Sequence, residues 1–138
     1  MRVRVATART GKVQKVPVVS IIDDDESVRT ATQCLVRSLG LKTRTFASAE
    51  EFLLSPYVTE TSCVIADVQM AKMSGLELQS RLRACGNDLP MIFITAFPDE
   101  RLKVRALEDG AVCFLSKPFD GQVLIDCLSK ALAAAGTE

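Results

Sequence analysis

The chain has 138 residues, the size of one compact domain, and 48% of them are hydrophobic, which is enough for a core. It contains no histidine, which excludes catalysis or metal binding through imidazole, and no apolar run approaches the roughly 18 residues of a membrane span. The net charge of zero is uneven: residues 1–16 carry five basic and no acidic residues, so the remainder carries 12 basic and 17 acidic residues, a net −5. A domain of that charge is not expected to bind nucleic acid directly.

The charge pattern also suggests a division of the chain. We predict a basic, flexible N-terminal extension at 1–16, since chain termini are commonly poorly ordered. A single domain is predicted at 17–133, and 134–138 would form a tail or the start of a linker. The five cysteines are dispersed and form no Cys-x-x-Cys pair, so buried reduced thiols are expected rather than disulfides or zinc. Reduced thiols favour a cytoplasmic location.

Short apolar runs alternate with helical periods from the start of the domain. A β-branched run predicts a strand at 18–22, and an acidic cluster at 23–26 separates it from a helix that ends at Gly40. A weaker strand is predicted at 41–46. The residues predicted on the buried face of the first helix are Val28, Ala31, Leu35 and Leu39.

The next two predicted elements follow from end signals. Ser48 and Glu51 form a capping-box pattern that opens a short helix, which stops before Pro56. A third strand at 63–66 ends at Asp67.

The second half of the chain repeats this alternation. A loop leads to a third helix near 75–86, and a fourth strand follows at 91–95. A fourth helix begins at Pro98 and closes at Gly110, a fifth strand covers 112–115, and a last helix runs over 118–133. The residues predicted on the buried face of the last helix are Val123, Cys127, Leu128, Ala131 and Leu132.

Five successive strand–helix units determine the predicted fold class. Strands that are apolar throughout indicate a parallel sheet with helices on both faces. Five strands are too few for an eight-stranded barrel, so we predict an α/β fold with an open, doubly wound sheet. Ligands of such sheets bind at the carboxyl ends of the strands.

Polar residues gather at that edge of the predicted sheet. Clustered carboxylates suit a hard cation such as Mg²⁺, and a carboxylate can attack phosphorus. An ammonium group and a metal can then neutralise a transferring phosphoryl group. Each residue taken singly fits a capping, turn or surface role, but their joint position favours a reactive cleft. The polar residues at this edge are Asp23, Asp24, Asp25, Asp67, Thr95, Ser116 and Lys117.

Five motifs at these strand ends carry a family resemblance. They are Ile21-Ile22-Asp23-Asp24, the lone Asp67, Met70-x-x-Met73-Ser74-Gly75, Thr95-Ala96 and Lys117-Pro118-Phe119. Together they resemble the receiver domain of two-component response regulators, and in style the FixJ/NodW-like branch, over about residues 17–133. The resemblance implies a flavodoxin-like (βα)5 fold with strand order 2-1-3-4-5, a signalling role rather than an enzyme, and a cytoplasmic protein.

The resemblance implies a role for each site residue. Asp67 would accept a phosphoryl group from a histidine kinase or a small phosphodonor, and Lys117 would pair with that group or with Asp67. Asp23 and Asp24 would hold Mg²⁺, or Mn²⁺ in its place, together with Asp67 and the backbone carbonyl of Gln69.

The resemblance also implies a switch. Thr95 would move toward the phosphoryl oxygens and Phe114 would turn inward, altering the face of the fourth helix, fifth strand and fifth helix. That face would bind a partner or form a phosphorylation-dependent homodimer, and DNA would be bound only by an output domain outside this segment. The alternative interpretation is that the charged residues of this face are simply solvated. The residues of the face are Arg101, Lys103, Arg105, Leu107, Phe114 and Lys117.

Three positions near the site are expected to affect the order of the loop and the access of water. Ala71 stands where the family usually has proline, which is expected to loosen the loop, because proline would fix φ. Phe97 and Gln69 would lie at the mouth of the site and influence how water reaches the phosphoryl group. We expect Phe97 to restrict water there.

Two other functions fit parts of the sequence. Asp23 and Asp25 match the Asp-x-Asp opening of haloacid-dehalogenase-type phosphohydrolases, as nucleophile and general acid. Those enzymes also need an acidic pair after a later strand, and the only candidates, Asp99-Glu100 and Glu108-Asp109, fall on the fourth helix. An interaction module that is never phosphorylated is the other alternative.

Overall fold

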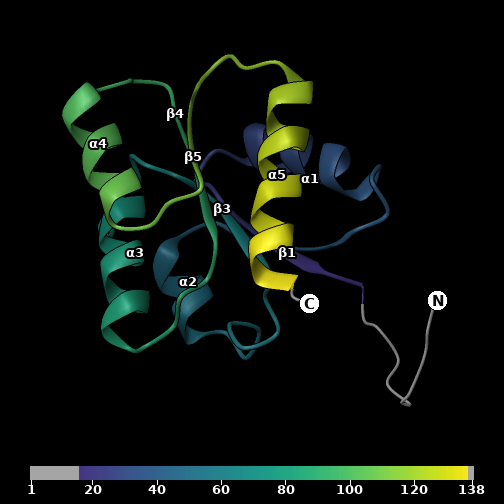
Figure 1. The fold of residues 1–138 in the computed structure, drawn as a ribbon, viewed down its shortest axis with the longest axis horizontal. Coiled ribbons are helices and arrows are strands. Elements are labelled where there is room, and N and C mark those ends of the chain that lie inside the picture. The colour runs from purple at the N-terminus through teal and green to yellow at the C-terminus, as the bar shows by residue number, and fades with distance from the viewer. Residues whose placement is uncertain (1–15, 137–138) are drawn as a thin grey trace.

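A parallel sheet of five strands organises the chain in this computed structural model, which describes residues 16–136 (Figure 1). The spatial order β2-β1-β3-β4-β5 confirms the predicted doubly wound α/β sheet. The predicted N-terminal extension lies almost wholly outside the described residues. The strands are β1 (Val18–Ile22), β2 (Lys42–Phe46), β3 (Cys63–Asp67), β4 (Met91–Thr95) and β5 (Cys113–Ser116).

Five helices cover the two faces of the sheet. Helices α1 and α5 pack on one face, and α2, α3 and α4 pack on the other (Figure 1). Among the described residues, no helix is both long and apolar enough to cross a bilayer. The helices are α1 (Glu26–Arg37), α2 (Ala49–Leu54), α3 (Gly75–Ala84), α4 (Glu100–Glu108) and α5 (Gly121–Gly136).

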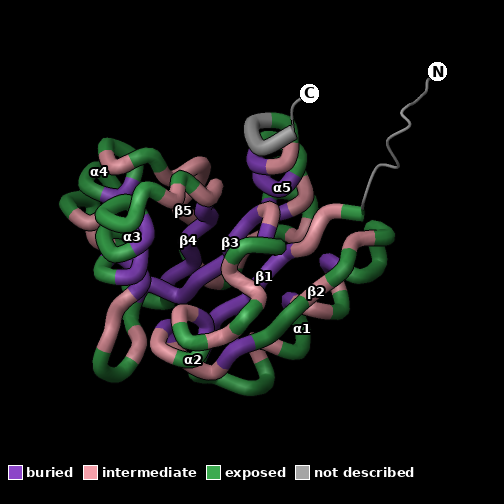
Figure 2. The backbone as a smooth tube through the Cα atoms, turned by 90° about the horizontal axis from the view of Figure 1, so that it is seen from below, coloured by how far each residue is buried: buried purple, intermediate pink, exposed green. Residues whose placement is uncertain are grey.

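Two apolar cores result, one on each side of the sheet. Every residue of β3 and β4 is buried, whereas the edge strand β2 is mostly exposed (Figure 2). Alternate residues of a strand point to opposite faces, so Ile65 packs toward α1 and α5 while Ala66 packs toward α2 and α3. The central strands are therefore held from both sides, which fixes the positions of the residues that follow them.

The buried faces of two helices differ from the prediction. In α1, Val28 and Leu35 pack against the core as predicted, but the buried residues are Thr32 and Val36. Ala31, also predicted on the buried face, is exposed. Leu39 is exposed because α1 ends at Arg37, and Leu39 no longer follows the helical period. In α5, Leu124 is fully buried and Val123 is exposed. The larger leucine takes the core position, while Cys127, Leu128 and Ala131 are buried as predicted.

The prediction of reduced thiols was correct for three of the five cysteines, and burial was wrongly predicted for two of those three. Cys113 on β5 and Cys127 on α5 form a disulfide, with 6.2 Å between their Cα atoms. These elements pack against each other, and the dispersed spacing in the sequence did not reveal that the two side chains meet. Cys34 and Cys85 are exposed. Cys63 is both buried and reduced, as predicted. Burial raises the pKa of its thiol to about 12, which keeps the thiol protonated.

Hydrogen bonds at the helix starts partly match the predicted caps. Ser48 accepts a hydrogen bond from the backbone of Glu51, as a capping box requires, but the Glu51 carboxylate accepts from Ala47 instead of Ser48. A complete capping box occurs at α3, where Ser74 and Glu77 bond reciprocally. This second box fixes the end of the loop that follows β3.

Gly75 lies so close to β3 that a residue with a Cβ atom would not fit at this position. A Cβ atom at Gly75 would stand 2.5 Å from the carbonyl oxygen of Asp67 and 3.0 Å from a ring carbon of Phe93. The substitution Gly75→Ala should therefore lower the free energy of unfolding by about 1–3 kcal/mol through overpacking, measured by urea denaturation. Gly121→Ala is the control, because its nearest neighbour, Leu35, is 3.7 Å away. Equal losses in the two variants would contradict this account of Gly75.

Candidate functional site

Three carboxylates meet at the carboxyl edge of the sheet. Asp23 follows β1 and Asp67 ends β3, and because β1 and β3 are parallel neighbours these residues share one edge. Oxygen atoms of Asp23, Asp24 and Asp67 all lie within 4.8 Å of one another. Oxygen donors at this spacing are the ligand type that Mg²⁺ takes, so the residues fit a hard divalent cation.

Backbone and side-chain hydrogen bonds fix Asp23 in this cluster. Its N–H donates to the carbonyl of Phe46 on β2, and its own carbonyl accepts from the guanidinium of Arg29 at 2.7 Å. One carboxylate oxygen of Asp23 accepts from the N–H of Asp25 at 2.9 Å. The side chain is only 1% exposed, so the other oxygen is presented to the cluster from a rigid position.

Lys117 brings the positive charge to the cluster from β5. Its Nζ lies 3.5 Å from Oδ2 of Asp23 and 3.8 Å from Oδ2 of Asp67. The N–H of Lys117 donates to the carbonyl of Thr95 at 2.7 Å, which ties the lysine backbone to the end of β4. One ammonium group thus contacts two carboxylates at once. Residues predicted at the ends of β1, β3, β4 and β5 therefore lie together at this edge of the sheet.

The electrostatic environment distinguishes Asp67 from the other carboxylates. Burial, reinforced by the charge of Asp23, raises the pKa of Asp67 to about 6, although the Lys117 ammonium and the N–H of Gln69 oppose the shift. A buried carboxylate beside a second one resists ionisation unless more positive charge arrives. A cation at this edge would therefore favour the ionised form of Asp67.

Asp25 lies outside the cluster and caps α1. Its carboxylate accepts hydrogen bonds from the backbone N–H groups of Ser27 and Val28 and from the Ser27 hydroxyl, and the hydroxyl bond lowers the pKa of Asp25. A general acid must hold a proton near neutral pH, and these bonds favour the ionised form. Asp99 likewise caps α4 through Arg101. Neither arrangement matches the phosphohydrolase site considered from the sequence.

Thr95 takes part in a small hydrogen-bond network. It is fully buried at the end of β4, and its hydroxyl donates to the side-chain Oε1 of Gln69 at 2.5 Å. The N–H of Phe97 donates to the same hydroxyl oxygen at 3.0 Å. The sequence placed Gln69 at the site but gave no sign of its side-chain bond to Thr95, because the two residues are 26 positions apart.

The two aromatic residues predicted near the site lie in different environments. Phe97, whose N–H bonds to the Thr95 hydroxyl, is 71% exposed. Phe114 is partly buried on β5, with its ring centroid 6.4 Å from that of Phe93 at a tilt of 54°. Phe114 thus packs against the core without being enclosed by it.

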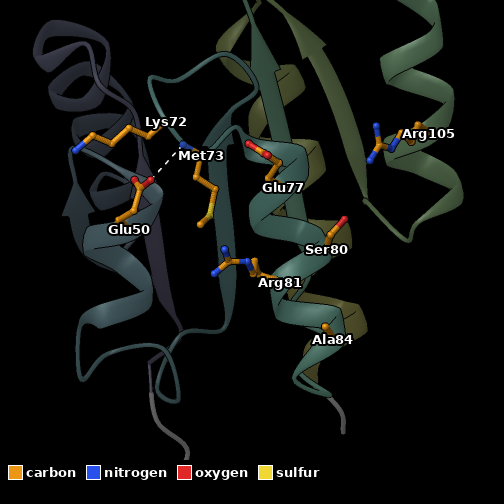
Figure 3. A pocket seen from close by; sticks show the side chains of 8 residues that line it. All are labelled: Glu50, Lys72, Met73, Glu77, Ser80, Arg81, Ala84 and Arg105. Carbon is orange, nitrogen blue, oxygen red and sulfur yellow. Dashed lines mark hydrogen bonds between the residues drawn. The ribbon is translucent and has the colours of Figure 1, made fainter.

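Several contacts hold the loop after β3, where Ala71 replaces the proline of the family pattern. The N–H of Met73 donates to the Glu50 carboxylate on α2 at 3.2 Å, as Figure 3 shows. The N–H of Gly75 donates to the carbonyl of Val68 at 3.0 Å, and Lys72 adopts a left-handed φ of 67°. The pocket in Figure 3 lies along this loop and α3 and includes none of the three clustered carboxylates. The predicted loosening by Ala71 stays a prediction.

Comparison with known families identifies most of the domain. The sequence profile described as the response regulator receiver domain matches residues 19–129.

Individual relatives agree with this match. The transcriptional regulatory protein TdiR of Thauera aromatica is 39% identical over 88% of this chain and 54% of its own length. Nodulation protein W of Bradyrhizobium diazoefficiens is 42% identical over 80% of this chain and 49% of its own length. The solved structure of the response regulator StyR is 40% identical with a TM-score of 0.81, over 88% of this chain and 61% of that one. The chain thus spans about half the length of the curated relatives it matches.

The raised pKa of Asp67 predicts an unusual pH dependence of the metal-free protein. The folded state binds the Asp67 proton more tightly than the unfolded chain does, so this stabilising effect is complete below the ordinary pKa of 3.8 and is lost as the pH rises through about 6. In EDTA, the melting temperature of Asp67→Asn relative to wild type should therefore rise from about pH 4 to about pH 7.

Asp25→Asn is the control, because the pKa of Asp25 is lowered, so its stabilising effect is present above the ordinary pKa of 3.8 and is lost only as the pH falls below that value. The relative melting temperature of Asp25→Asn should therefore change little from about pH 4 to about pH 7. A flat difference for Asp67→Asn would contradict the pKa assigned to Asp67.

Proposed function

Since this chain belongs to the response regulator receiver domain family, we propose that Asp67 is its phosphoacceptor, phosphorylated by a histidine kinase. The observation that carries the proposal is that a carboxylate oxygen of Asp67 lies within 4.8 Å of those of Asp23 and Asp24, and that another contact joins Asp67 to the ammonium of Lys117 at 3.8 Å. Such a site holds a carboxylate nucleophile and the positive charge that a phosphoryl group requires.

The reaction is a transfer of one phosphoryl group. A carboxylate oxygen of Asp67 attacks phosphorus, forming an O–P bond, while the bond from phosphorus to the donor breaks and the donor keeps its electron pair. Asp67 must be ionised to attack, and the nearby ammonium of Lys117 favours that form. The same ammonium is placed to donate hydrogen bonds to the phosphoryl oxygens, which stabilises the product. We assign no enzymatic activity to the domain beyond phosphorylating and dephosphorylating itself.

The clustered oxygens would hold the metal. The ligands would be Asp23, Asp24, Asp67 and the backbone carbonyl of Gln69, with Mg²⁺ as the natural ion and Mn²⁺ as a substitute. When bound, the cation supplies positive charge that offsets the repulsion between the carboxylates and the incoming phosphoryl group. Asp23 is held rigidly and Asp24 is exposed, so these two residues would respectively anchor the ion and admit it from solvent.

Phosphorylation would act through the end of β4. A phosphoryl group adds charge and acceptor oxygens, toward which the Thr95 hydroxyl would move while Phe114 turns inward. The result would be a population shift of the face formed by α4, β5 and α5, which would then support a homodimer. This face already exposes Val104, Leu107 and Val123, three apolar side chains that a partner could cover.

The whole protein would act beyond this domain. The relatives that are about twice as long include a transcriptional regulatory protein, so the output would be transcriptional control through a DNA-binding domain outside this segment. The segment itself, a receiver domain at 17–133 flanked by 1–16 and 134–138, would not bind DNA directly. The protein would act in the cytoplasm, where its kinase presents the phosphoryl donor.

Phosphorylation of Asp67 can be tested by intact mass. With Mg²⁺ and acetyl phosphate, wild type should gain the mass of one phosphoryl group, and Asp67→Asn should gain none. Asp25→Asn is the matched control, because it removes a neighbouring carboxylate while asparagine still caps α1. It should be phosphorylated like wild type. An adduct that persists in Asp67→Asn, or one lost in Asp25→Asn, would contradict the assignment.

Phe97 is expected to slow hydrolysis of the phosphorylated form. Its backbone N–H bonds to the Thr95 hydroxyl and Phe97 is exposed, so the ring would lie at the mouth of the site and restrict the access of water to the phosphoryl group. Phe97→Ala should therefore shorten the half-life of the phosphorylated protein, followed by mass after the phosphodonor is removed. Leu54→Ala, which removes an exposed side chain on α2, is the control. An unchanged half-life in Phe97→Ala would refute this role.

A further inference from the structure

The hydroxyl of Thr95 is already occupied in the resting arrangement. It donates to Oε1 of Gln69 at 2.5 Å and accepts from the N–H of Phe97 at 3.0 Å. A threonine hydroxyl has a single proton to donate. Because that proton is in the hydrogen bond to Gln69, Thr95 can donate to another acceptor only after this hydrogen bond breaks.

Gln69 contacts both the phosphoacceptor and Thr95. Its backbone N–H faces the Asp67 carboxylate and lowers the pKa of that group. Its side chain reaches from the loop after β3 to the end of β4, where Thr95 is fully buried. The amide oxygen of Gln69 is therefore the acceptor that competes with any new acceptor arriving on Asp67.

We propose that the side chain of Gln69 is a latch that holds the Thr95 hydroxyl in its resting position and so resists the response to phosphorylation. The proposal rests on the function proposed above and adds a positioning residue to it. A neutral hydrogen bond changes an equilibrium constant by between about twofold and tenfold. Gln69 would therefore set how completely a given level of phosphorylation shifts the domain, without taking part in the transfer itself.

The latch differs from a role of Gln69 in steering water or in binding the metal. Those roles act directly at Asp67 and would persist without the Thr95 hydroxyl. The latch acts only through that hydroxyl. The two explanations therefore separate in a double-mutant cycle that combines a change at Gln69 with one at Thr95.

The experiment measures the affinity for beryllofluoride, a phosphoryl mimic that binds a carboxylate together with Mg²⁺. Gln69→Leu removes the acceptor while keeping a side chain of similar size, and should bind the mimic about twofold to tenfold more tightly than wild type. Thr95→Val removes the hydroxyl while keeping the shape of the side chain. In the Thr95→Val background, Gln69→Leu should change the affinity by less than about twofold.

A matched control exists elsewhere in the chain. Gln33 donates to the Thr43 hydroxyl at 3.0 Å, a glutamine–threonine pair that joins α1 to β2. Gln33→Leu removes this bond away from the carboxylate cluster and should leave the affinity unchanged. Equal effects of Gln69→Leu in both backgrounds, or weaker binding in the single variant, would overturn the latch while leaving Asp67 as the phosphoacceptor.

A second measurement does not depend on phosphorylation. The amide of Phe97 donates to the Thr95 hydroxyl, so its ¹H–¹⁵N resonance reports on that hydroxyl without any ligand. It should shift in Gln69→Leu and stay in place in Gln33→Leu. An unmoved Phe97 resonance in Gln69→Leu would overturn the latch. A different result would contradict the proposed function: wild type neither binds the mimic nor gains a phosphoryl group, although the Phe97 resonance shifts in Gln69→Leu. The hydrogen bond would then exist, but Gln69 could not control a response to phosphorylation.

Discussion

The contact between the Lys117 ammonium and two buried carboxylates is the interaction on which this edge of the sheet depends. At about 4 Å, two like charges repel by roughly 4 kcal/mol at an effective dielectric constant near 20. Lys117 lies within 3.8 Å of both Asp23 and Asp67, so a single positive charge opposes that repulsion. Burial, with the charge of Asp23 as the second cause, still raises the pKa of Asp67 to about 6. The edge thus retains a deficit of positive charge, and a divalent cation fits it better than a second lysine, because the donors are all oxygens.

The same edge is held by backbone contacts that tie reactive residues to the scaffold. Lys117 bonds to the carbonyl of Thr95, and Gly75 packs directly against the carbonyl of Asp67. The start of α3 and the end of β4 are therefore coupled to the carboxylate cluster without any intervening side chain. Packed interfaces of this kind shift between discrete arrangements rather than deforming smoothly. A charge added at Asp67 would therefore act on both elements through direct contacts.

Much of the fold and of the candidate site could be predicted from the sequence, because both follow from local signals. Apolar β-branched runs specified the strands, and the parallel sheet then placed Asp23, Asp67 and Lys117 at one edge. Pairings between side chains from different elements could not be predicted in this way. The bond between Gln69 and Thr95 and the disulfide between Cys113 and Cys127 depend on how elements meet in space. The burial of Thr32 and Val36 on α1 was missed for a related reason, since the helical period allowed more than one rotation against the sheet, although Val28 and Leu35 pack against the core as predicted.

The hydrogen bonds of Thr95 bear on how the proposed response to phosphorylation would proceed. Its hydroxyl carries one proton, so a bond to Gln69 and a bond to a phosphoryl oxygen exclude each other. Full burial adds to this exclusivity, because a buried hydroxyl that leaves one partner must find another or remain unsatisfied. Intermediate positions of Thr95 are therefore disfavoured relative to both end states. The exposed ring of Phe97, whose N–H binds the same hydroxyl, would then move with whichever partner Thr95 takes.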